Sequence, residues 1–150
     1  MFTLRLKDLR FETGVVMSRV ERAERRNLMK QGAFVRTAAK SSIKPRKKPS
    51  RPGNPPRSHT GLLKRHIYFV HDPVRRTVVI GPTLLNSAKR RNVRPATTVP
   101  NVLEYGGKAR VIDRRTLRTR TIRIAERPYM RPALKKGLDD LERIWKDSVT

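Results

Sequence analysis

Residues 13–40 read TGVVMSRVERAERRNLMKQGAFVRTAAK, a run without proline that predicts one long helix. The less polar positions recur at intervals of three and four, as on one face of a helix. They are Val16, Val20, Ala23, Asn27, Gln31, Phe34 and Ala38. At about 1.5 Å per residue this helix would be roughly 40 Å long, a length that suits packing against neighbouring elements.

The segment that follows, SSIKPRKKPSRPGNPPRS at residues 41–58, has a different composition. It holds five prolines and six lysines or arginines, and Ile43 is its one large apolar residue. Because proline lacks a backbone donor and disfavours helix at the residue before it, the segment predicts an extended basic arm or loop. Loops longer than about 12–15 residues in a compact domain are usually functional or disordered, which makes this one a candidate contact region.

Beyond this segment the hydrophobic period changes from helical spacing to two, which predicts β-strands. Residues 63–71 and 74–81 are rich in β-branched and aromatic side chains. Asp72 and Pro73 between them are a turn signal, so the two runs predict a β-hairpin. Residues 82–100 predict an irregular, basic stretch.

A second hairpin is predicted nearer the C-terminus. Residues 102–105 suggest a short helical turn that ends at Gly106 and Gly107. Residues 109–112 and 119–125 then predict two strands, and alternation in the second places apolar side chains on one face and polar ones on the other.

The last predicted element is an amphipathic helix of about four turns, because Leu134, Leu138, Leu141 and Trp145 recur at intervals of four, three and four. Pro132 suits the first turn of that helix. The predicted fold class is α+β: a small antiparallel β-sheet of two hairpins packs against the long N-terminal helix and the C-terminal amphipathic helix. A length of 150 residues suits a single domain over residues 1–150.

The chain is strongly basic, with 37 Lys and Arg against 12 Asp and Glu and a formal net charge of +25. Nucleic acid, an acidic protein surface or an anionic membrane surface would relieve the self-repulsion. The hydrophobic fraction is 36% and the mean hydropathy is −0.67, so we expect a modest monomer core and further burial on assembly. No apolar run of 18 residues and no secretory h-region occur, so neither a membrane span nor a signal peptide is expected.

Residues that could carry catalysis or hold a metal ion are few. The absence of cysteine excludes disulfides, thiolate metal sites and a cysteine nucleophile. The histidines are His59, His66 and His71, and the last two, five residues apart in a predicted strand, would lie on opposite faces. Phosphate-loop, nucleophile-elbow and zinc-protease motifs do not occur. We therefore expect no enzyme activity, no cofactor and no metal site.

Two basic clusters are candidate contacts with DNA or with an acidic partner. The first lies in the arm and comprises Lys44, Arg46, Lys47, Lys48, Arg51 and Arg57, and the second comprises Lys89, Arg90, Arg91 and Arg94. Each contact with a phosphate would add a salt-sensitive affinity that does not specify sequence. No zinc-finger spacing, aromatic stacking platform or evident helix-turn-helix accompanies them, which argues against sequence-specific reading.

Three segments, in this order, resemble one family. Residues 53–67, GNPPRSHTGLLKRHI, are similar to the "P…TG.L..SI" passage of the tail-completion or neck proteins of tailed bacteriophages, the group that includes lambda's minor tail protein Z. Residues 102–107, VLEYGG, resemble that family's "Y…vE.G" passage, and residues 127–134, RPYMRPAL, resemble its "RPFmrPAl" signature. The chain departs from the family pattern in its basicity and at residues 64–67, KRHI, where a more neutral start of a strand is usual.

The resemblance implies a structural subunit of the virion. It implies a ring of six or twelve identical copies between the head-closure or adaptor proteins and the tail-terminator or tail-tube proteins, with no membrane partner. Heterologous contacts close such a ring when the rotation fits. Genomic double-stranded DNA would pass through or stop at the lumen in the neck of the virion, and assembly would take place in the host cytoplasm. The alternative is a stand-alone basic accessory protein that binds nucleic acid.

The same segments contain residues for which an interface or structural role is predicted: Thr60, Gly61, Glu104, Gly106, Pro128, Tyr129, Met130 and Pro132. Gly61 permits the positive φ of a turn before a strand. Glu104 is expected to be a buried or interface acid that faces an arginine. Tyr129 and Met130 form an apolar plug between two prolines, packed either into the core or between subunits.

Overall fold

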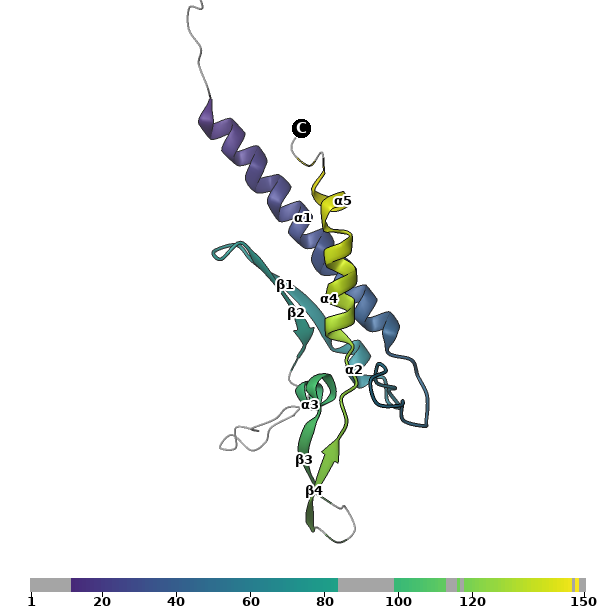
Figure 1. Ribbon diagram of the computed structural model, residues 1–150. Coiled ribbons are helices and arrows are strands. Elements are labelled where there is room, and N and C mark those ends of the chain that lie inside the picture. Colours follow the sequence, from purple (N-terminus) through teal and green to yellow (C-terminus); the bar gives the residue numbers. More distant parts are fainter. Residues whose placement is uncertain (1–11, 84–98, 113–115, 117, 147, 149–150) are drawn as a thin grey trace, which may run out of the picture.

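A computed structural model describes residues 12–83, 99–112, 116, 118–146 and 148 of the chain. In chain order the elements are α1 (Thr13–Ser42), α2 (Leu62–Arg65), β1 (Ile67–Asp72), β2 (Thr77–Pro82), α3 (Val99–Tyr105), β3 (Gly107–Ile112), β4 (Thr119–Ile124), α4 (Met130–Asp139) and α5 (Leu141–Trp145) (Figure 1). This mixture of helices and small antiparallel sheets confirms the predicted α+β class. None of the helices in the described ranges is both long and apolar enough to cross a bilayer.

The C-terminal half of α1 is the element around which the fold is built. Hairpin β1–β2 and α4 both pack against it (Figure 1). A Cβ atom on Gly32 of α1 would lie 2.8 Å from both Phe69 Cδ2 and Val78 Cγ1. A Cβ atom on Gly137 of α4 would overlap Cγ2 of Val35. Glycine at these two positions therefore allows the hairpin and α4 to approach the backbone of α1 closely.

The core lies where α1 ends. Three of its side chains, Val35, Ala39 and Ile43, come from the end of α1 and the residue after it, and each is at most 1% exposed. They pack together with Leu63, Ile67, Tyr129 and Ala133. The apolar core is therefore small and joins the end of α1 to the starts of β1 and α4.

The predicted apolar face of α1 is only partly right. Ala23 and Asn27 are buried as predicted, whereas Val16 and Val20 are exposed because nothing in the described residues covers the first turns of the helix. Farther along, the buried positions move to Gly32, Val35 and Ala39. The face changes because α1 packs against two elements there, and the side chains between them are also drawn into the core.

Both predicted hairpins form, as two separate two-stranded antiparallel sheets. In the first, Phe69 pairs with Ile80 and Val70 with Val79. Its first strand begins at Ile67 and not at residue 63, because residues 62–65 form the helical turn α2. The expectation of strand from residue 63 is therefore wrong: the turn starts from Gly61, whose φ of 73° is left-handed and favours glycine.

The remaining helices differ from the prediction in their ends. α3 begins at Val99, within the stretch predicted to be irregular. The predicted C-terminal helix is divided at Asp140 into α4 and α5, and α4 begins at Met130. Pro132 therefore occupies the third helical position and not the first, which the helix tolerates because that residue has no intrahelical acceptor for an N–H.

Two leucines of the predicted apolar stripe, Leu134 and Leu138, do not face the core. Leu134 and Leu138 are 47% and 53% exposed, while Ala133 and Gly137 are buried. Small residues face α1 because the close approach of the two helix backbones leaves no space for a larger side chain. The apolar stripe of α4 is consequently left on the surface.

Residues 43–58 form a loop that closes on itself. Pro45 and Ser58 form an isolated parallel bridge, and the Ser58 N–H donates to the Lys44 carbonyl at 3.2 Å. Ile43, at the start of the loop, is in the core. Ser41 and Ser42 belong to α1 and not to the predicted arm of residues 41–58. The rest of the segment lacks regular structure, as predicted, but its two ends are held together, so it is a closed loop and not an extended arm.

Two hydrogen bonds attach the middle of this loop to the segment that follows β4. The Gly53 N–H donates to the Glu126 carbonyl at 2.9 Å. Nε of Arg127 donates to the Ser50 carbonyl at 3.2 Å. The loop therefore lies against the body of the protein, beside the base of hairpin β3–β4 (Figure 1).

Candidate functional site

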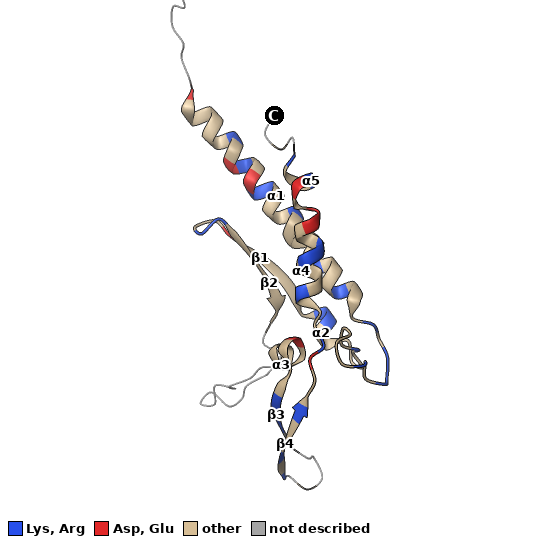
Figure 2. Ribbon diagram, in the orientation of Figure 1, with Lys and Arg blue, Asp and Glu red and all other residues tan. Residues whose placement is uncertain are grey.

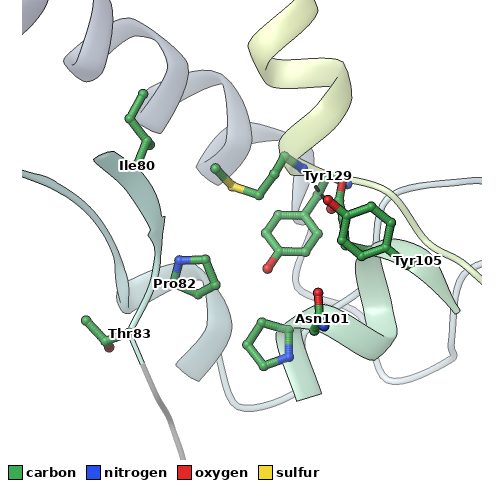
Figure 3. Close-up of a pocket in the computed structure, with 9 residues that line it drawn as sticks. Ile80, Pro82, Thr83, Asn101, Tyr105 and Tyr129 are labelled. Atoms are coloured by element: carbon green, nitrogen blue, oxygen red, sulfur yellow. Dashed lines mark hydrogen bonds between the residues drawn. The ribbon is translucent and has the colours of Figure 1, made fainter. Parts of the chain in front are cut away.

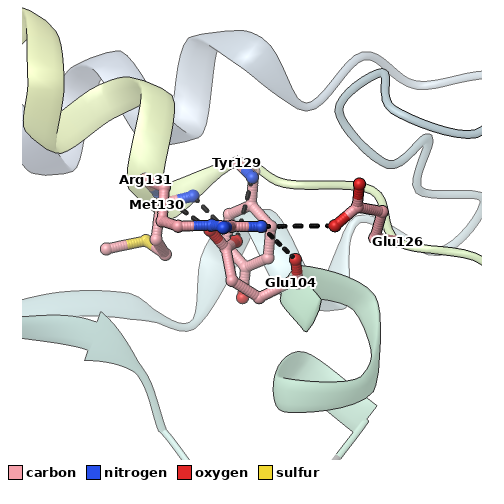
Figure 4. Close-up of polar contacts among 5 residues, drawn as sticks. All are labelled: Glu104, Glu126, Tyr129, Met130 and Arg131. Atoms are coloured by element: carbon pink, nitrogen blue, oxygen red, sulfur yellow. Dashed lines mark hydrogen bonds and ion pairs between the residues drawn. The ribbon is translucent and has the colours of Figure 1, made fainter. Parts of the chain in front are cut away.

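The carboxylate of Glu104, on α3, lies against the N-terminus of α4 (Figure 4). Its Oε2 accepts the N–H groups of Tyr129 and Met130 at 2.9 and 3.0 Å. Its Oε1 accepts the N–H of Arg131 at 2.8 Å. Glu104 thus caps a helix that begins about 25 residues later, whose own N-cap residue makes no side-chain cap bond.

Several effects make the contact between Glu104 and the N-terminus of α4 stabilising. The first N–H groups of a helix have no partner within the helix, and the helix dipole favours a negative charge near them. Hydrogen bonds to an ionised acceptor are stronger than those between neutral groups. Because the Glu104 side chain is only 6% exposed, water competes little for these bonds. The contact fixes α3 against α4.

Arg131 completes the cluster around Glu104. Its Nε lies 3.6 Å from Oε1 of Glu104, and its Nη2 lies 3.4 Å from the exposed carboxylate of Glu126. Its guanidinium also lies over the ring of Tyr105, 5.2 Å from the centroid. Glu104, predicted to be a buried or interface acid that faces an arginine, is buried within the chain and lies beside Arg131.

Tyr129 packs into the core of the chain. Its side chain is 1% exposed, and Met130 is partly buried against the same cluster. Burial, and secondly the charge of Glu104, raise the pKa of the Tyr129 hydroxyl above its ordinary value of 10.0. Of the flanking prolines, Pro128 is half-buried and Pro132 is exposed.

The ring of Tyr129 borders a pocket of about 300 Å³ between the end of β2, α3 and α4 (Figure 3). Apolar and aromatic side chains dominate its lining, with Asn101 and Glu104 as polar groups. Glu104 is already engaged by the N-terminus of α4.

The three segments that resemble the phage family lie together in space. A second pocket, of about 330 Å³, is lined by Thr60 and Leu63 from the first segment, Leu103 from the second and Arg127 from the third. The Arg127 N–H donates to the Leu103 carbonyl at 2.6 Å. Segments up to about 70 residues apart in sequence thus form one structural unit with the Glu104 contact.

Two predicted turn residues have conformations that explain their identity. Thr60 is exposed, and its hydroxyl accepts the N–H of Leu62 at 3.4 Å, next to the left-handed Gly61. Gly106 has a φ of 72°, and a Cβ atom there would lie 3.1 Å from the backbone nitrogen of Glu126. At both positions the residue identity suits a turn of the backbone.

The six basic residues of the first cluster are all exposed. They are Lys44, Arg46, Lys47, Lys48, Arg51 and Arg57, and all lie on the loop of residues 43–58. Within the part of the chain that the structure describes, none of them is within ion-pair distance of a carboxylate. The second cluster, Lys89, Arg90, Arg91 and Arg94, lies outside the described residues.

A third set of cations was missed from the sequence. Lys108, Arg110 and Arg123 lie on hairpin β3–β4 and are exposed. Their alternation with Ala109, Ile122 and Ile124 was visible in the sequence and already indicated a polar face. That Lys108 and Arg123 stand opposite each other depends on the register of the hairpin, which the sequence did not provide.

The described residues contain no group of three or more His, Asp or Glu side chains that could hold a metal ion. Comparison of the chain with protein-family models, curated proteins and solved structures gives no match. The resemblance of the three segments to phage tail-completion proteins therefore stays a prediction.

Proposed function

We propose that this chain is a structural subunit of the head–tail connector of a tailed bacteriophage, a neck or tail-completion ring that surrounds the DNA path. The proposal includes no catalytic role. Its partners would be further copies of the same chain, the head-closure or adaptor proteins on one side, and the tail-terminator or tail-tube proteins on the other.

The convergence of the three family-like segments is the observation that carries the proposal. Had the three likenesses arisen by chance, nothing would require residues 53–67, 102–107 and 127–134 to meet. They meet in one pocket lining, in the Leu103–Arg127 backbone bond and in the cap that Glu104 supplies to α4. This supports the interpretation of the segments as parts of one inherited structural unit.

The distribution of exposed apolar side chains supports self-assembly. Val16, Met17 and Val20 are 37–53% exposed on the first half of α1, and Leu138 is 53% exposed on α4. Near this surface Glu21 and Glu24 pair with Arg76, and Asp140 pairs with Arg143, so part of the positive charge that a second copy would meet is offset. A ring contact would bury this surface, which the small core leaves exposed.

The test is the oligomeric state of the purified chain, measured by native mass spectrometry and negative-stain electron microscopy over a range of protein concentrations. We expect rings, and we expect Leu138→Ser to shift the population towards monomer. Val74→Ser, at a 90% exposed position in the β1–β2 turn, is the matched control and should leave the rings intact.

A chain that stays monomeric at all concentrations, and that is absent from purified particles of the phage that encodes it, would overturn the proposal. A monomer that binds nucleic acid tightly would instead support the accessory-protein alternative.

A further inference from the structure

Positive charge is concentrated at one end of the molecule. Between Glu24 and Asp72 the sequence contains 13 lysines and arginines and no acidic residue. Figure 2 shows carboxylates on α1, on the α4–α5 boundary, on α3 and after β4, whereas the described parts of the 43–58 loop and of hairpin β3–β4 carry only cations. In the described residues, the loop and the hairpin therefore carry positive charge that no acidic residue of their own offsets.

The hairpin carries its cations in an arrangement that costs stability. Lys108 of β3 stands directly opposite Arg123 of β4, and Arg110 pairs with Thr121 two residues farther along the same face. Side chains that are directly opposite lie about 5 Å apart at Cβ, and like charges in such a pair are destabilising. In the described residues no carboxylate lies within ion-pair distance of these three cations. The pairing of Lys108 with Arg123 therefore does not contribute to the stability of the fold.

The loop continues this surface. Its hydrogen bonds to Glu126 and Arg127 fix residues 50–53 beside the segment that follows β4. We call the combined surface the basic end; it comprises Lys44, Arg46, Lys47, Lys48, Arg51, Arg57, Lys108, Arg110, Arg118, Arg120 and Arg123. All eleven side chains are exposed.

In the described residues, the basic end lacks the apolar side chains that a protein partner would need. The core of a protein–protein interface is apolar and depleted of charge. The large apolar side chains that this chain exposes lie on α1, α2, α3, α4, α5 and hairpin β1–β2, and in the described residues none lies on the loop or on hairpin β3–β4. A polyanion of regular spacing fits such a surface better than an acidic protein does.

We infer that the basic end is a contact surface for the sugar–phosphate backbone of duplex DNA, with Lys108, Arg110 and Arg123 as its central residues. Cations two residues apart on a strand are about 6.8 Å apart. That distance equals the rise of two base pairs along the DNA helix axis, at about 3.4 Å per base pair. A two-stranded ribbon also matches the width of a major groove of about 12 Å. The inference rests on the proposed function in one respect: in a connector ring, the basic end would be the surface that faces the DNA path.

The test is fluorescence anisotropy with a labelled 30-base-pair duplex, titrated with the full chain at several salt concentrations. Each lost phosphate contact lowers the slope of log affinity against log salt by about 0.9, and lowers the affinity at 0.1 M salt by about eightfold. We therefore expect K108Q/R123Q to weaken binding by about 60-fold at that salt concentration. K47Q/K48Q, on the loop, should also weaken it.

The matched control is R22Q/R25Q, which also removes two positive charges, but from exposed positions on the first half of α1. We expect less than about a threefold loss there, because long-range attraction is screened over about 10 Å at 0.1 M salt. Thermal unfolding checks that the variants fold; K108Q/R123Q should be at least as stable as the wild type, since it removes a repulsive pair.

Three results would overturn the inference: equal losses in K108Q/R123Q and R22Q/R25Q, no dependence of binding on salt, or displacement of the duplex by an equal charge of polyglutamate, which would indicate an acidic protein partner. Ring formation is measured separately. If the chain forms rings and K108Q/R123Q binds DNA as tightly as the wild type, this inference alone is overturned. If the chain stays monomeric and K108Q/R123Q weakens DNA binding, the connector proposal alone is overturned.

Discussion

Removal of the Glu104 carboxylate should loosen the junction between α3 and α4. Glu104→Ala leaves three helix N–H groups without their acceptor. The N–H of Tyr129 is buried, so it loses its bond without gaining water, while those of Met130 and Arg131 are only partly buried and can be rehydrated.

A magnitude follows from these three bonds. An ordinary N-cap residue contributes about 0.5–2 kcal/mol. A buried donor left unsatisfied costs about 1–3 kcal/mol. We expect Glu104→Ala to lower the free energy of unfolding by about 3 kcal/mol, and Glu104→Gln, which keeps one acceptor oxygen, by about half of that. With a urea dependence of about 2 kcal/mol per molar, the alanine variant should unfold at about 1.5 M less urea.

The assay is equilibrium unfolding in urea at one fixed protein concentration, followed by far-UV circular dichroism and by the fluorescence of Trp145. Glu126→Gln is the control, because Glu126 pairs with the same Arg131 but has a side chain that is 56% exposed. It should change the free energy of unfolding by about 0.5 kcal/mol or less. A loss below about 1 kcal/mol for Glu104→Ala, or equal losses for both positions, would refute the capping role.

Two further predictions concern the core. The pKa of Tyr129 is raised in the folded chain, so only the unfolded state loses the hydroxyl proton as the pH passes 10.0. The free energy of unfolding should therefore fall from pH 10 to 12, and Tyr129→Phe should remove part of that fall. Identical pH profiles for the wild type and Tyr129→Phe would contradict this prediction. Gly137→Ala should lower the free energy of unfolding by about 1–3 kcal/mol, because the added methyl group overlaps Val35. Gly14→Ala, at a position with open space, is the control and should be neutral or stabilising. If thermal unfolding ranks the two variants in the opposite order, α4 can shift away from α1.

Much of the secondary structure was predictable because its signals are local. The proline-free run gave α1 to within two residues of its end, and Asp72 with Pro73 gave the turn of the first hairpin. The composition of residues 41–58 predicted a segment without regular structure, and this holds from residue 43 onward. In each case the residues that carry the signal lie within the element that they specify.

The errors arose where one element responds to another. Leucine spacing in α4 indicated a core face at Leu134 and Leu138, but the approach of α1 selected Ala133 and Gly137 instead. Residues 62–65 had strand composition, yet the left-handed turn at Gly61 starts a helical turn there. Local propensity cannot show which face a distant backbone will approach.

The candidate site was predictable in its residues but not in its geometry. Glu104 stood out as an acid among arginines, and Arg131 is indeed near it. Nothing local indicated that its carboxylate would accept three N–H groups about 25 residues away. Likewise, Lys108 and Arg123 become a cross-strand pair only once the register of β3 and β4 is known.

The Glu104 contact with α4 has a consequence for how this chain can change over evolution. Hairpin β3–β4 lies wholly between the two partners of that contact, so it is a loop whose ends are already pinned. The entropy of closing such a loop grows only with the logarithm of its length, and doubling the length costs about 0.6 kcal/mol. Insertions between β3 and β4 should therefore be tolerated, and evolution could lengthen or shorten the hairpin without disturbing the body that carries it.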